Sequence, residues 1–306
     1  MPGMQTSSAT RPSRTADGLA VTRLTRHIGA EVHGIDLRAE LAGTLDPSLV
    51  AALRTAVAEH HVIMLRDQHL TAEQHARLAR AFGEIQPSPV HLAIGRDATP
   101  TVSTIEDTAA RPPAGFPWHT DVSWVAAPPE LGFLSAVVIP EVGGDTLWAS
   151  TAAIHDALPE ELRRRCGECV VLHAPDPSLL ASVERHHGAA AAARLRARHP
   201  GTLHPLVRTD PLIGRRSLYL CPLSARRLLG PDGTEDATLL ARLHGMLDDP
   251  HVQVRWRWRA GDLVIWDEAA TCHRALTDHF PQRRVMRRCV TASRSTGGGR
   301  PRIIGT

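Results

Sequence analysis

The chain has 306 residues, 42% of them hydrophobic, which is enough to bury a sizeable core in one large domain or two modest ones. No stretch approaches the run of roughly 18 apolar residues that a membrane span needs, so no membrane partner is expected. All 35 basic side chains are arginine, which excludes Schiff-base chemistry on lysine and a Walker phosphate loop. The net charge of +3, with 32 acidic residues spread along the chain, does not indicate a nucleic-acid partner.

The start of the chain is polar and lacks a hydrophobic signal segment, so we expect a disordered tail over 1–17 and a cytoplasmic protein. Residues 18–306 are expected to form a single domain. The five cysteines are an odd number, which argues against a disulfide framework. Cys166 and Cys169 have the CxxC spacing of half a zinc site, but no second pair lies nearby. Buried or partly buried thiols are the plainer interpretation.

The first hundred residues predict strands that alternate with helices. Residues 19–24 are predicted to form a strand, and a helix follows with Asp46 as its N-cap and Pro47 at its first position. A short buried strand at 61–66 comes next. Thr71 begins a capping-box pattern that opens a second helix.

After residue 100 short apolar strands recur between Pro and Gly turns. Such a series predicts an all-β sandwich or barrel core with helices packed outside it, a mainly β fold of the α+β class. The predicted strands are TVSTI, LGFLSAVVI, DTLWAS, ECVVLH, TLHPLVR, SLYL, VQVRWRW, DLVIW and RRVMRRCV.

Two helical segments interrupt these strands. An insertion at about 174–200 is predicted to hold a loop and an Ala-rich helix, and another helix is predicted around 235–248. Long insertions on β scaffolds serve either as lids over sites or as surface decoration, and both alternatives remain open here.

Arg and Trp alternate in VQVRWRWRAGD. One interpretation is a stacking surface for single-stranded nucleic acid. The favoured one is a half-buried strand, because residues two apart share a face. It places Trp256 and Trp258 on one face and Arg255, Arg257 and Arg259 on the other.

The stretch FPWHTDVSW holds a candidate metal-binding pair, His119 and Asp121. A chain with 18 histidines and 32 acids gives about two His-x-Asp/Glu pairs by chance, so on this pair alone a solvated or capping role is the favoured interpretation. In a strand, however, both side chains would point to the same side. One further histidine would complete the 2-His-1-carboxylate triad that leaves open positions on Fe(II). The candidate is His273, which follows the strand DLVIW.

The last strand of the core is rich in arginine. One face carries Arg284, Met286 and Arg288, and the other carries Arg287 and Cys289. If Met286 faces the interior, two guanidinium groups do so as well and need anionic partners. Strand alternation alone leaves the opposite orientation open.

Several motifs in order resemble the taurine dioxygenase (TauD/TfdA) family of Fe(II)- and 2-oxoglutarate-dependent oxygenases. The resemblance spans about 20–292 and implies a double-stranded β-helix, or jelly-roll, core. The motifs are IGAEVHGIDL, RDQHLTAEQHARLARAFGEI, WHTDVSW followed by PPE, VGGDTLWAS, HPLVRTDPLIGRRSLYL and VRWRWRAGDLVIWD with its later histidine and PQRRVMRR.

The resemblance implies roles for residues that match these motifs. His119 and Asp121 match the iron ligands of the WHTD motif, and His273 matches the distal histidine. Thr146 and Arg284 match the residues that hold the distal carboxylate of 2-oxoglutarate. Fe(II) is therefore the expected metal, with 2-oxoglutarate and O₂ as cosubstrates.

The substrate pocket matches less closely. Arg288 matches the arginine that binds the sulfonate of taurine, and Trp124 matches an aromatic residue near the substrate. Ser88 and His91 stand where the family has a histidine and a tyrosine, and Gly115 replaces an asparagine. Taurine is therefore a doubtful substrate, whereas an anionic group is still expected.

Two further departures lie near the end of the core. The family's WDN-R motif beside the distal histidine is Trp266-Asp267-Glu268-Ala269 in this chain. The family's usual histidine before the last arginine is Arg287.

The implied function is a dioxygenase that oxidises, preferentially hydroxylates, an aliphatic C–H of a small anionic substrate and releases succinate and CO₂. A sulfonate, sulfate ester, phosphate or carboxylate would fit. One alternative is the same iron chemistry diverted to desaturation or cyclisation in specialised metabolism. Another is a non-catalytic β-barrel binding protein. Family members are commonly dimers or tetramers, so a homodimer or homotetramer is compatible with the sequence.

Overall fold

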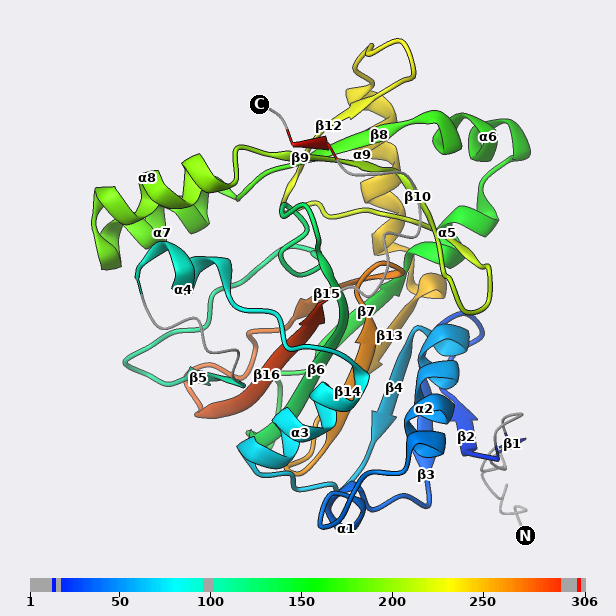
Figure 1. Ribbon diagram of the computed structural model, residues 1–306, viewed down its shortest axis with the longest axis vertical. Helices are drawn as coiled ribbons and strands as arrows, with labels where there is room; N and C mark the ends of the chain where they lie inside the picture. Colours follow the sequence, from blue (N-terminus) through cyan, green and yellow to red (C-terminus); the bar gives the residue numbers. More distant parts are fainter. Residues whose placement is uncertain (1–12, 15–17, 96–101, 293–301, 304–306) are drawn as a thin grey trace, which may run out of the picture.

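The computed structural model describes residues 13–14, 18–95, 102–292 and 302–303 (Figure 1). The helices are α1 (Leu37–Glu40), α2 (Pro47–His60), α3 (Ala72–Phe82), α4 (Pro89–Ala93), α5 (Thr151–Ala157), α6 (Glu160–Glu168), α7 (Pro177–His187), α8 (Ala189–Arg198) and α9 (Ala237–Gly245), with 3₁₀ turns η1 (Met246–Asp248) and η2 (Pro250–Val252). The strands are β1 (Ser13–Arg14), β2 (Ala20–Arg23), β3 (Ala30–His33), β4 (Val62–Leu65), β5 (Ser103–Asp107), β6 (Pro129–Val138), β7 (Thr146–Ser150), β8 (Val170–His173), β9 (Thr202–Pro205), β10 (Val207–Thr209), β11 (Arg216–Leu218), β12 (Ala225–Leu229), β13 (Gln253–Trp256), β14 (Leu263–Asp267), β15 (Thr271–Ala275), β16 (Arg284–Ala292) and β17 (Arg302–Ile303). The predicted α+β class is confirmed. The predicted tail over 1–17 falls outside the described residues except for β1, which pairs with β2.

The first two long helices begin where the sequence predicts. The side chain of Asp46 accepts a hydrogen bond from the backbone of Ser48, and Pro47 opens α2. Both hydrogen bonds of the capping box between Thr71 and Gln74 are present at the start of α3. No helix among the described residues is long and apolar enough to cross a membrane.

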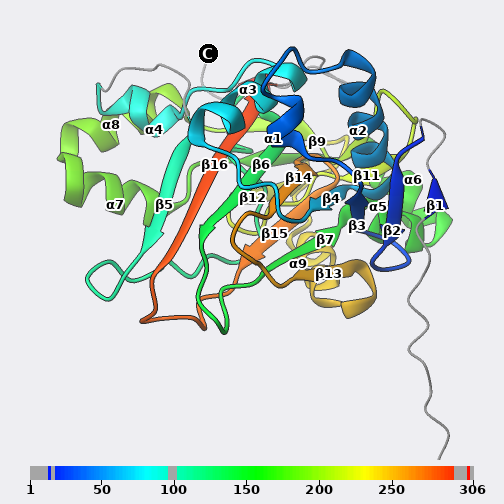
Figure 2. The same cartoon turned by 90° about the horizontal axis from the view of Figure 1, so that it is seen from below.

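An eight-stranded sheet forms the largest layer, in the order β1-β2-β3-β4-β14-β6-β16-β5. α2 and α3 lie over one face of this sheet (Figure 2). Leu53 of α2, Phe82 of α3 and Phe133 of β6 are buried in the apolar cluster between the helices and the sheet. The helices thus cover one face of the sheet and leave the other face for a second sheet.

The three-stranded sheet β13-β7-β15 packs on that other face. Met64, Trp266 and Met286 of the large sheet meet Trp148 of β7 and Trp256 of β13 in one buried cluster. Two sheets that face each other across such a cluster form a sandwich.

The alternation around β13 follows the prediction of a half-buried strand. Trp256 and Trp258 are each 3% exposed and lie in the cluster between the sheets. The exposed arginines between and beside them are Arg255, Arg257 and Arg259.

A further apolar cluster lies among α5, α6, α9 and the sheet β12-β8-β9-β17. Cys166 and Cys169 are buried in this cluster. Burial raises the pKa of the Cys166 thiol to about 11. The interpretation of both cysteines as buried thiols therefore agrees with the packing.

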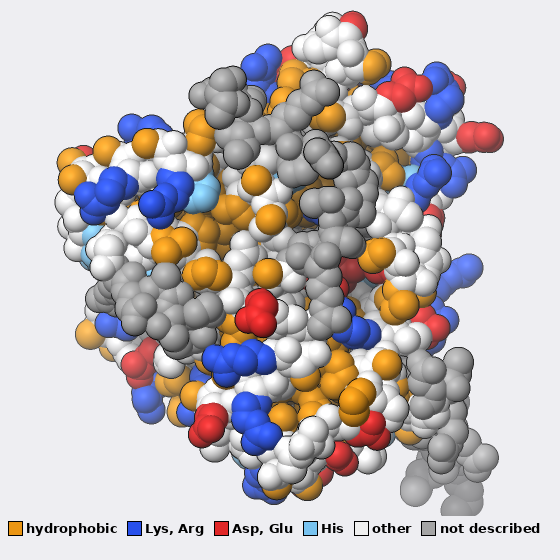
Figure 3. Space-filling model, viewed as in Figure 1, with side chains coloured by type: hydrophobic (Ala, Val, Ile, Leu, Met, Phe, Trp, Pro, Cys, Tyr) orange, Lys and Arg blue, Asp and Glu red, His pale blue; other side chains and the backbone are white. Residues whose placement is uncertain are grey.

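The insertion at 174–200 contains two helices, α7 and α8, and not the single Ala-rich helix that we expected. Gly188, with φ +84°, ends α7 and precedes α8. We call residues 177–198 the helical arm. α8 packs against α4, and Arg194 Nε donates to the carbonyl of Ala93 (2.8 Å). Basic side chains lie on the outer surface of the arm, and hydrophobic side chains lie between it and the centre of the molecule (Figure 3).

Candidate metal centre

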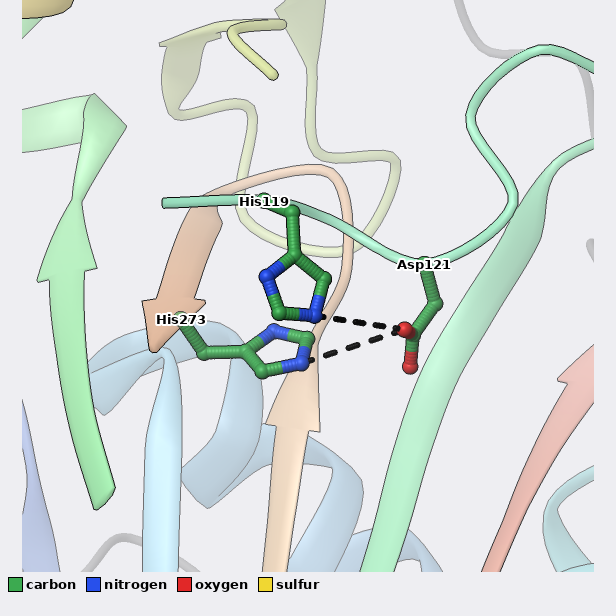
Figure 4. Close-up of side chains that lie close together, drawn as sticks. All are labelled: His119, Asp121 and His273. Atoms are coloured by element: carbon green, nitrogen blue, oxygen red, sulfur yellow. Dashed lines mark ion pairs between the residues drawn. The ribbon is translucent and has the colours of Figure 1, made fainter. Parts of the chain in front are cut away.

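The structure brings His119, Asp121 and His273 together, with their side chains pointing toward one another (Figure 4). The Nε2 atoms of His119 and His273 lie 3.9 and 3.8 Å from Asp121 Oδ1. First-row divalent ions bind such atoms at about 2 Å, so two ligand atoms of one ion lie up to about 4 Å apart. Within the described ranges, this is the only group of three or more His, Cys, Asp or Glu side chains with ligand atoms within 4.8 Å of one another.

The backbone fixes two of these residues directly against each other. The N–H of His119 donates to the carbonyl of His273 (3.0 Å), and the N–H of His273 donates to the carbonyl of His119 (2.7 Å). His273 lies on β15, opposite Trp148 of β7. The chain turns directly after Asp121, because Val122 adopts a left-handed conformation (φ +49°) that β-branched residues rarely adopt.

The donor atoms suit a divalent transition-metal ion. His119 Nδ1 lies 2.9 Å from the carbonyl oxygen of Pro117, and donation to this oxygen leaves Nε2 free as a ligand. The ring of His273 packs edge-on against Trp266, with 5.2 Å between the centroids. Burial lowers the pKa of both imidazoles, which favours the neutral form that binds metals. Two imidazoles and one carboxylate form the facial triad typical of non-haem Fe(II), so these residues fit that ion.

Arg288 balances the charge of the buried carboxylate. Its guanidinium forms an ion pair with Asp121 Oδ2. Burial alone would raise the pKa of Asp121, but Arg288 and the rings of His273 and His119 outweigh it and lower the pKa. Asp121 is therefore ionised at neutral pH, in the form that binds a metal.

Glu268 supports the same segment from the loop between β14 and β15, and the sequence indicated it only as a departure from the family motif. Its Oε2 accepts a hydrogen bond from the N–H of Asp121 (2.9 Å) and lies 2.7 Å from Thr120 Oγ1. Burial, and then the nearby charge of Asp121, raise the pKa of Glu268 well above its ordinary value. No short motif could have indicated this contact, because 147 positions separate Glu268 from Asp121.

Thr146 lies on the same face of the three-stranded sheet as His273. It pairs with Ala275, two residues beyond His273 on β15, and residues two apart in a strand share a face. Its buried hydroxyl accepts a hydrogen bond from the indole N–H of Trp258 (3.0 Å).

Arg284 reaches the segment that contains Thr146 from the opposite sheet. Its Nε donates to the carbonyl of Gly144 (3.1 Å), and its Nη1 lies 3.9 Å from Asp107 Oδ2. A Cβ on Gly144 would lie 3.0 Å from Arg284 Cδ, so the glycine permits this approach. The structure therefore places the two residues predicted to bind 2-oxoglutarate next to the same short segment.

Packing resolves the orientation of β16 that alternation left open. Met286 is buried in the cluster between the two sheets, and Cys289 is buried in the cluster beneath α2 and α3. Arg284 and Arg288 therefore face the interior with Met286. Arg287 lies on the helix-covered face.

The other residues predicted to contact substrate lie toward the helical arm. Trp124 is buried among apolar side chains of the arm. Ser88 caps α4 by accepting a hydrogen bond from the N–H of His91 (3.5 Å), and no hydrogen bond in the described part of the chain links either residue to the triad. Phe116, which was not predicted, is 46% exposed, and its ring lies 5.8 Å from that of His119.

A separate cavity of about 300 Å³ lies beside the loop after β14. Asp267, Ala269 and Ala270 line it together with His61 and Arg208, and the three triad residues do not. The cavity is therefore distinct from the metal centre.

A His-x-Asp pair and a distant histidine, joined between two facing sheets with inward arginines beside them, are the arrangement of a 2-oxoglutarate-dependent dioxygenase. Comparisons with known proteins agree. Residues 20–290 match the family model described as "Taurine catabolism dioxygenase TauD, TfdA family". The chain belongs to this family, and the prediction of a 2-oxoglutarate-dependent dioxygenase is confirmed.

Similar proteins include an "Alpha-ketoglutarate-dependent sulfate ester dioxygenase" of Pseudomonas putida, 35% identical over 87% of this chain and 86% of that protein. An "Alkylsulfatase" of Acinetobacter baylyi is 34% identical over 92% of this chain and 87% of that protein. Among solved structures, a taurine dioxygenase from Burkholderia xenovorans is 32% identical with a TM-score of 0.73, covering 94% of this chain and 95% of that one.

Proposed function

We propose that this chain uses Fe(II) and 2-oxoglutarate to hydroxylate an aliphatic C–H of a small anionic substrate. The observation that carries the proposal is the buried triad of His119, Asp121 and His273 with the guanidinium of Arg288 beside it. When bound, Fe(II) would supply oxygen activation: O₂ would be the oxidant, giving one oxygen atom to the C–H bond and one to succinate, while 2-oxoglutarate loses CO₂. The names of the two relatives favour a sulfate ester as the substrate, and the name of the structurally similar taurine dioxygenase favours a sulfonate.

The protein's own residues have separate tasks in this proposal. The triad holds the ion through three atoms and leaves its remaining positions open. Arg284 and Thr146 bind the distal carboxylate of 2-oxoglutarate, because a guanidinium can donate two parallel hydrogen bonds to a carboxylate. The two facing sheets form a double-stranded β-helix around these groups and keep water away.

Arg288 fixes the charged end of the substrate. A guanidinium carries five N–H donors, so an arginine that contacts Asp121 retains donors for sulfate or sulfonate oxygens. Trp124, Ser88 and His91 border the substrate on the side of the helical arm. This geometry would hold one C–H near the metal centre, which is the main contribution of the protein to such a reaction.

The metal centre can be tested without turnover. Anaerobic addition of Fe(II) and 2-oxoglutarate should produce a weak visible charge-transfer band, which His119→Ala abolishes. His251→Ala removes an exposed histidine on η2 and should leave the band intact. Absence of the band in correctly folded wild-type protein would overturn the assignment.

The substrate class needs a second measurement. Succinate release should be compared across alkyl sulfates, sulfonates, phosphates and carboxylates, with the substrate-free rate as the baseline. We expect sulfates or sulfonates to stimulate it most. Stimulation by carboxylates alone would contradict that preference and leave the reaction class in place.

A further inference from the structure

Glu268 is a buried carboxyl group that the proposed reaction does not use. It is 1% exposed and lies in the loop between β14 and β15. We infer that Glu268 is a positioning residue that holds Asp121 in its metal-binding orientation. This inference rests on the proposed function only in taking His119, Asp121 and His273 as metal ligands.

One oxygen of Glu268 serves two consecutive residues. Oε2 accepts from the N–H of Asp121 at 2.9 Å and lies 2.7 Å from the hydroxyl of Thr120. The same hydroxyl lies 2.6 Å from the backbone carbonyl oxygen of Glu268. The contact therefore joins both the side chain and the backbone of Glu268 to the segment that carries Asp121.

The segment needs such support at Asp121, where it leaves the pairing with β15. His119 is tied to His273 by two hydrogen bonds, but the chain leaves this pairing at once and turns at Val122. The N–H of Asp121 is buried there, and buried N–H groups require an acceptor. Glu268 supplies that acceptor.

The backbone of Glu268 is itself held by the large sheet, on the side away from Asp121. Its N–H donates to the carbonyl of Glu130 at the start of β6 (3.0 Å). The preceding residue, Asp267, accepts hydrogen bonds from the N–H groups of Ala269 and Ala270, which closes the loop into a fixed turn. The backbone of Glu268 is thus held against the large sheet, and its carboxyl group holds the N–H of Asp121 at a fixed position relative to that sheet.

A direct ligand role fits the geometry less well. Oε2 is already engaged by the backbone of Asp121 and the hydroxyl of Thr120. Among the described residues, the set whose ligand atoms lie within 4.8 Å of one another contains His119, Asp121 and His273 and not Glu268. Residues that orient ligands in this way typically change metal affinity by about 10- to 100-fold when they are replaced.

The test measures Mn(II) affinity and the visible spectrum of the Co(II)-loaded protein, neither of which requires turnover. Glu268→Ala should raise the Kd for Mn(II) by about 10- to 100-fold and alter the Co(II) spectrum. Glu268→Gln keeps an acceptor for the N–H of Asp121 and should stay within about threefold of the wild-type Kd. Glu235→Ala, which removes an exposed glutamate paired with Arg227, is the matched control and should change neither readout.

Thr120→Val keeps the size of the side chain but removes the hydroxyl that contacts Glu268. This variant replaces Glu268→Ala in the test if Glu268→Ala does not fold. We expect it to raise the Kd severalfold. Unchanged affinity and spectrum in folded Glu268→Ala, or in Thr120→Val if the alanine variant fails to fold, would overturn the inference. An equal rise of the Kd for Mn(II) in Glu268→Gln and Glu268→Ala would also overturn the inference, because loss of the hydrogen bond to Asp121 would then not be the cause. Wild-type protein that binds no Mn(II) would instead contradict the proposed metal centre.

Discussion

Three arginines on β16 have different surroundings although they lie within five positions. Arg284 contacts Gly144 beside the predicted 2-oxoglutarate site, and Arg288 contacts Asp121 of the triad. Arg287 points to the other face of the sheet and donates to the carbonyl of Leu70 (2.9 Å). The direction of each side chain, and not its charge alone, therefore separates the roles proposed for them.

Replacing these arginines one at a time should separate substrate from cosubstrate binding. Arg288→Ala should raise the KM for the anionic substrate roughly a hundredfold, because loss of one partner of a charge pair that the bound substrate desolvates costs about 2–5 kcal/mol. It should leave substrate-free decarboxylation of 2-oxoglutarate largely intact. Arg284→Ala should instead raise the KM for 2-oxoglutarate. Steady-state kinetics with each compound varied in turn would measure both effects.

Arg287→Ala is the control on the same strand and should change neither KM. An equal rise of both KM values in Arg288→Ala would mean that this arginine serves the cosubstrate or the fold. In that case the substrate's anionic group would require a different partner.

At the scale of elements, the helical arm is attached to the segment that follows the triad. Trp124 shares a buried cluster with Val183 of α7 and with Leu195 of α8. Its ring also packs edge-on against His199, with 4.8 Å between the centroids. The arm is therefore placed to shape one side of the site, and the lid alternative of the sequence analysis remains a proposal.

Weakening the arm should affect substrate binding more than metal binding. Leu195→Ala removes a fully buried side chain and should destabilise the protein by about 2–5 kcal/mol. It should also raise the substrate KM while the Kd for Mn(II) stays unchanged. Denaturant unfolding, kinetics and metal titration would give the three values.

Leu228→Ala is the control variant, because it should destabilise the protein to a similar extent at a position outside the arm. Leu228 is equally buried but lies in the cluster around α5, α6 and α9. The substrate KM of this variant should equal that of wild type. If both variants shift KM equally, or if deleting the arm leaves turnover and substrate affinity unchanged, the arm does not contribute to the site.

Local capping signals predicted the starts of the first two long helices. Asp46 with Pro47, and Thr71 with Gln74, predicted the starts of α2 and α3 because the capping atoms lie within three residues. α5 and α6 were not predicted, because each has at most nine residues and α6 buries only Cys166. In the insertion the Ala-rich helix α8 was predicted, but a loop was expected where α7 lies.

The site was predictable only in part from spacing. On spacing alone, chance was the favoured explanation of His119 and Asp121. His273 was a candidate from its place after a strand, and the resemblance to a family gave it the role of the distal ligand. Strand alternation placed Arg284 and Arg288 on one face, but only packing shows which face is buried. Contacts between distant segments, such as Glu268 with Asp121, have no local signal.

At the scale of the whole molecule, several buried histidines make stability depend on pH. Burial lowers the pKa of His61 to about 3 and those of His75, His204 and His244 to about 4. The unfolded chain takes up these protons near pH 6.5, whereas the folded chain does not until much lower pH. The free energy of unfolding should therefore be constant above about pH 6.5 and fall as the pH drops from 6.5 toward 4.

This pH dependence can be measured by denaturant unfolding between pH 5 and pH 8. Below pH 6.5, His75→Asn should reduce the slope of the free energy of unfolding against pH by up to about 1.4 kcal/mol per pH unit. This change corresponds to the uptake of one proton on unfolding. His251→Asn, at a side chain that is 87% exposed, is the control. A slope that His75→Asn leaves unchanged would show that His75 is protonated in the folded protein.

The paired backbone hydrogen bonds between His119 and His273 also determine when the metal centre can form. During synthesis the chain carries only two of the three ligands until residue 273 has been added, and β16 with its arginines follows later. Chains are made from the N-terminus, and their early parts fold first. Metal binding at the proposed centre therefore requires a chain extended beyond residue 273, and a product truncated before it would lack the third ligand even if its first strands and helices had folded.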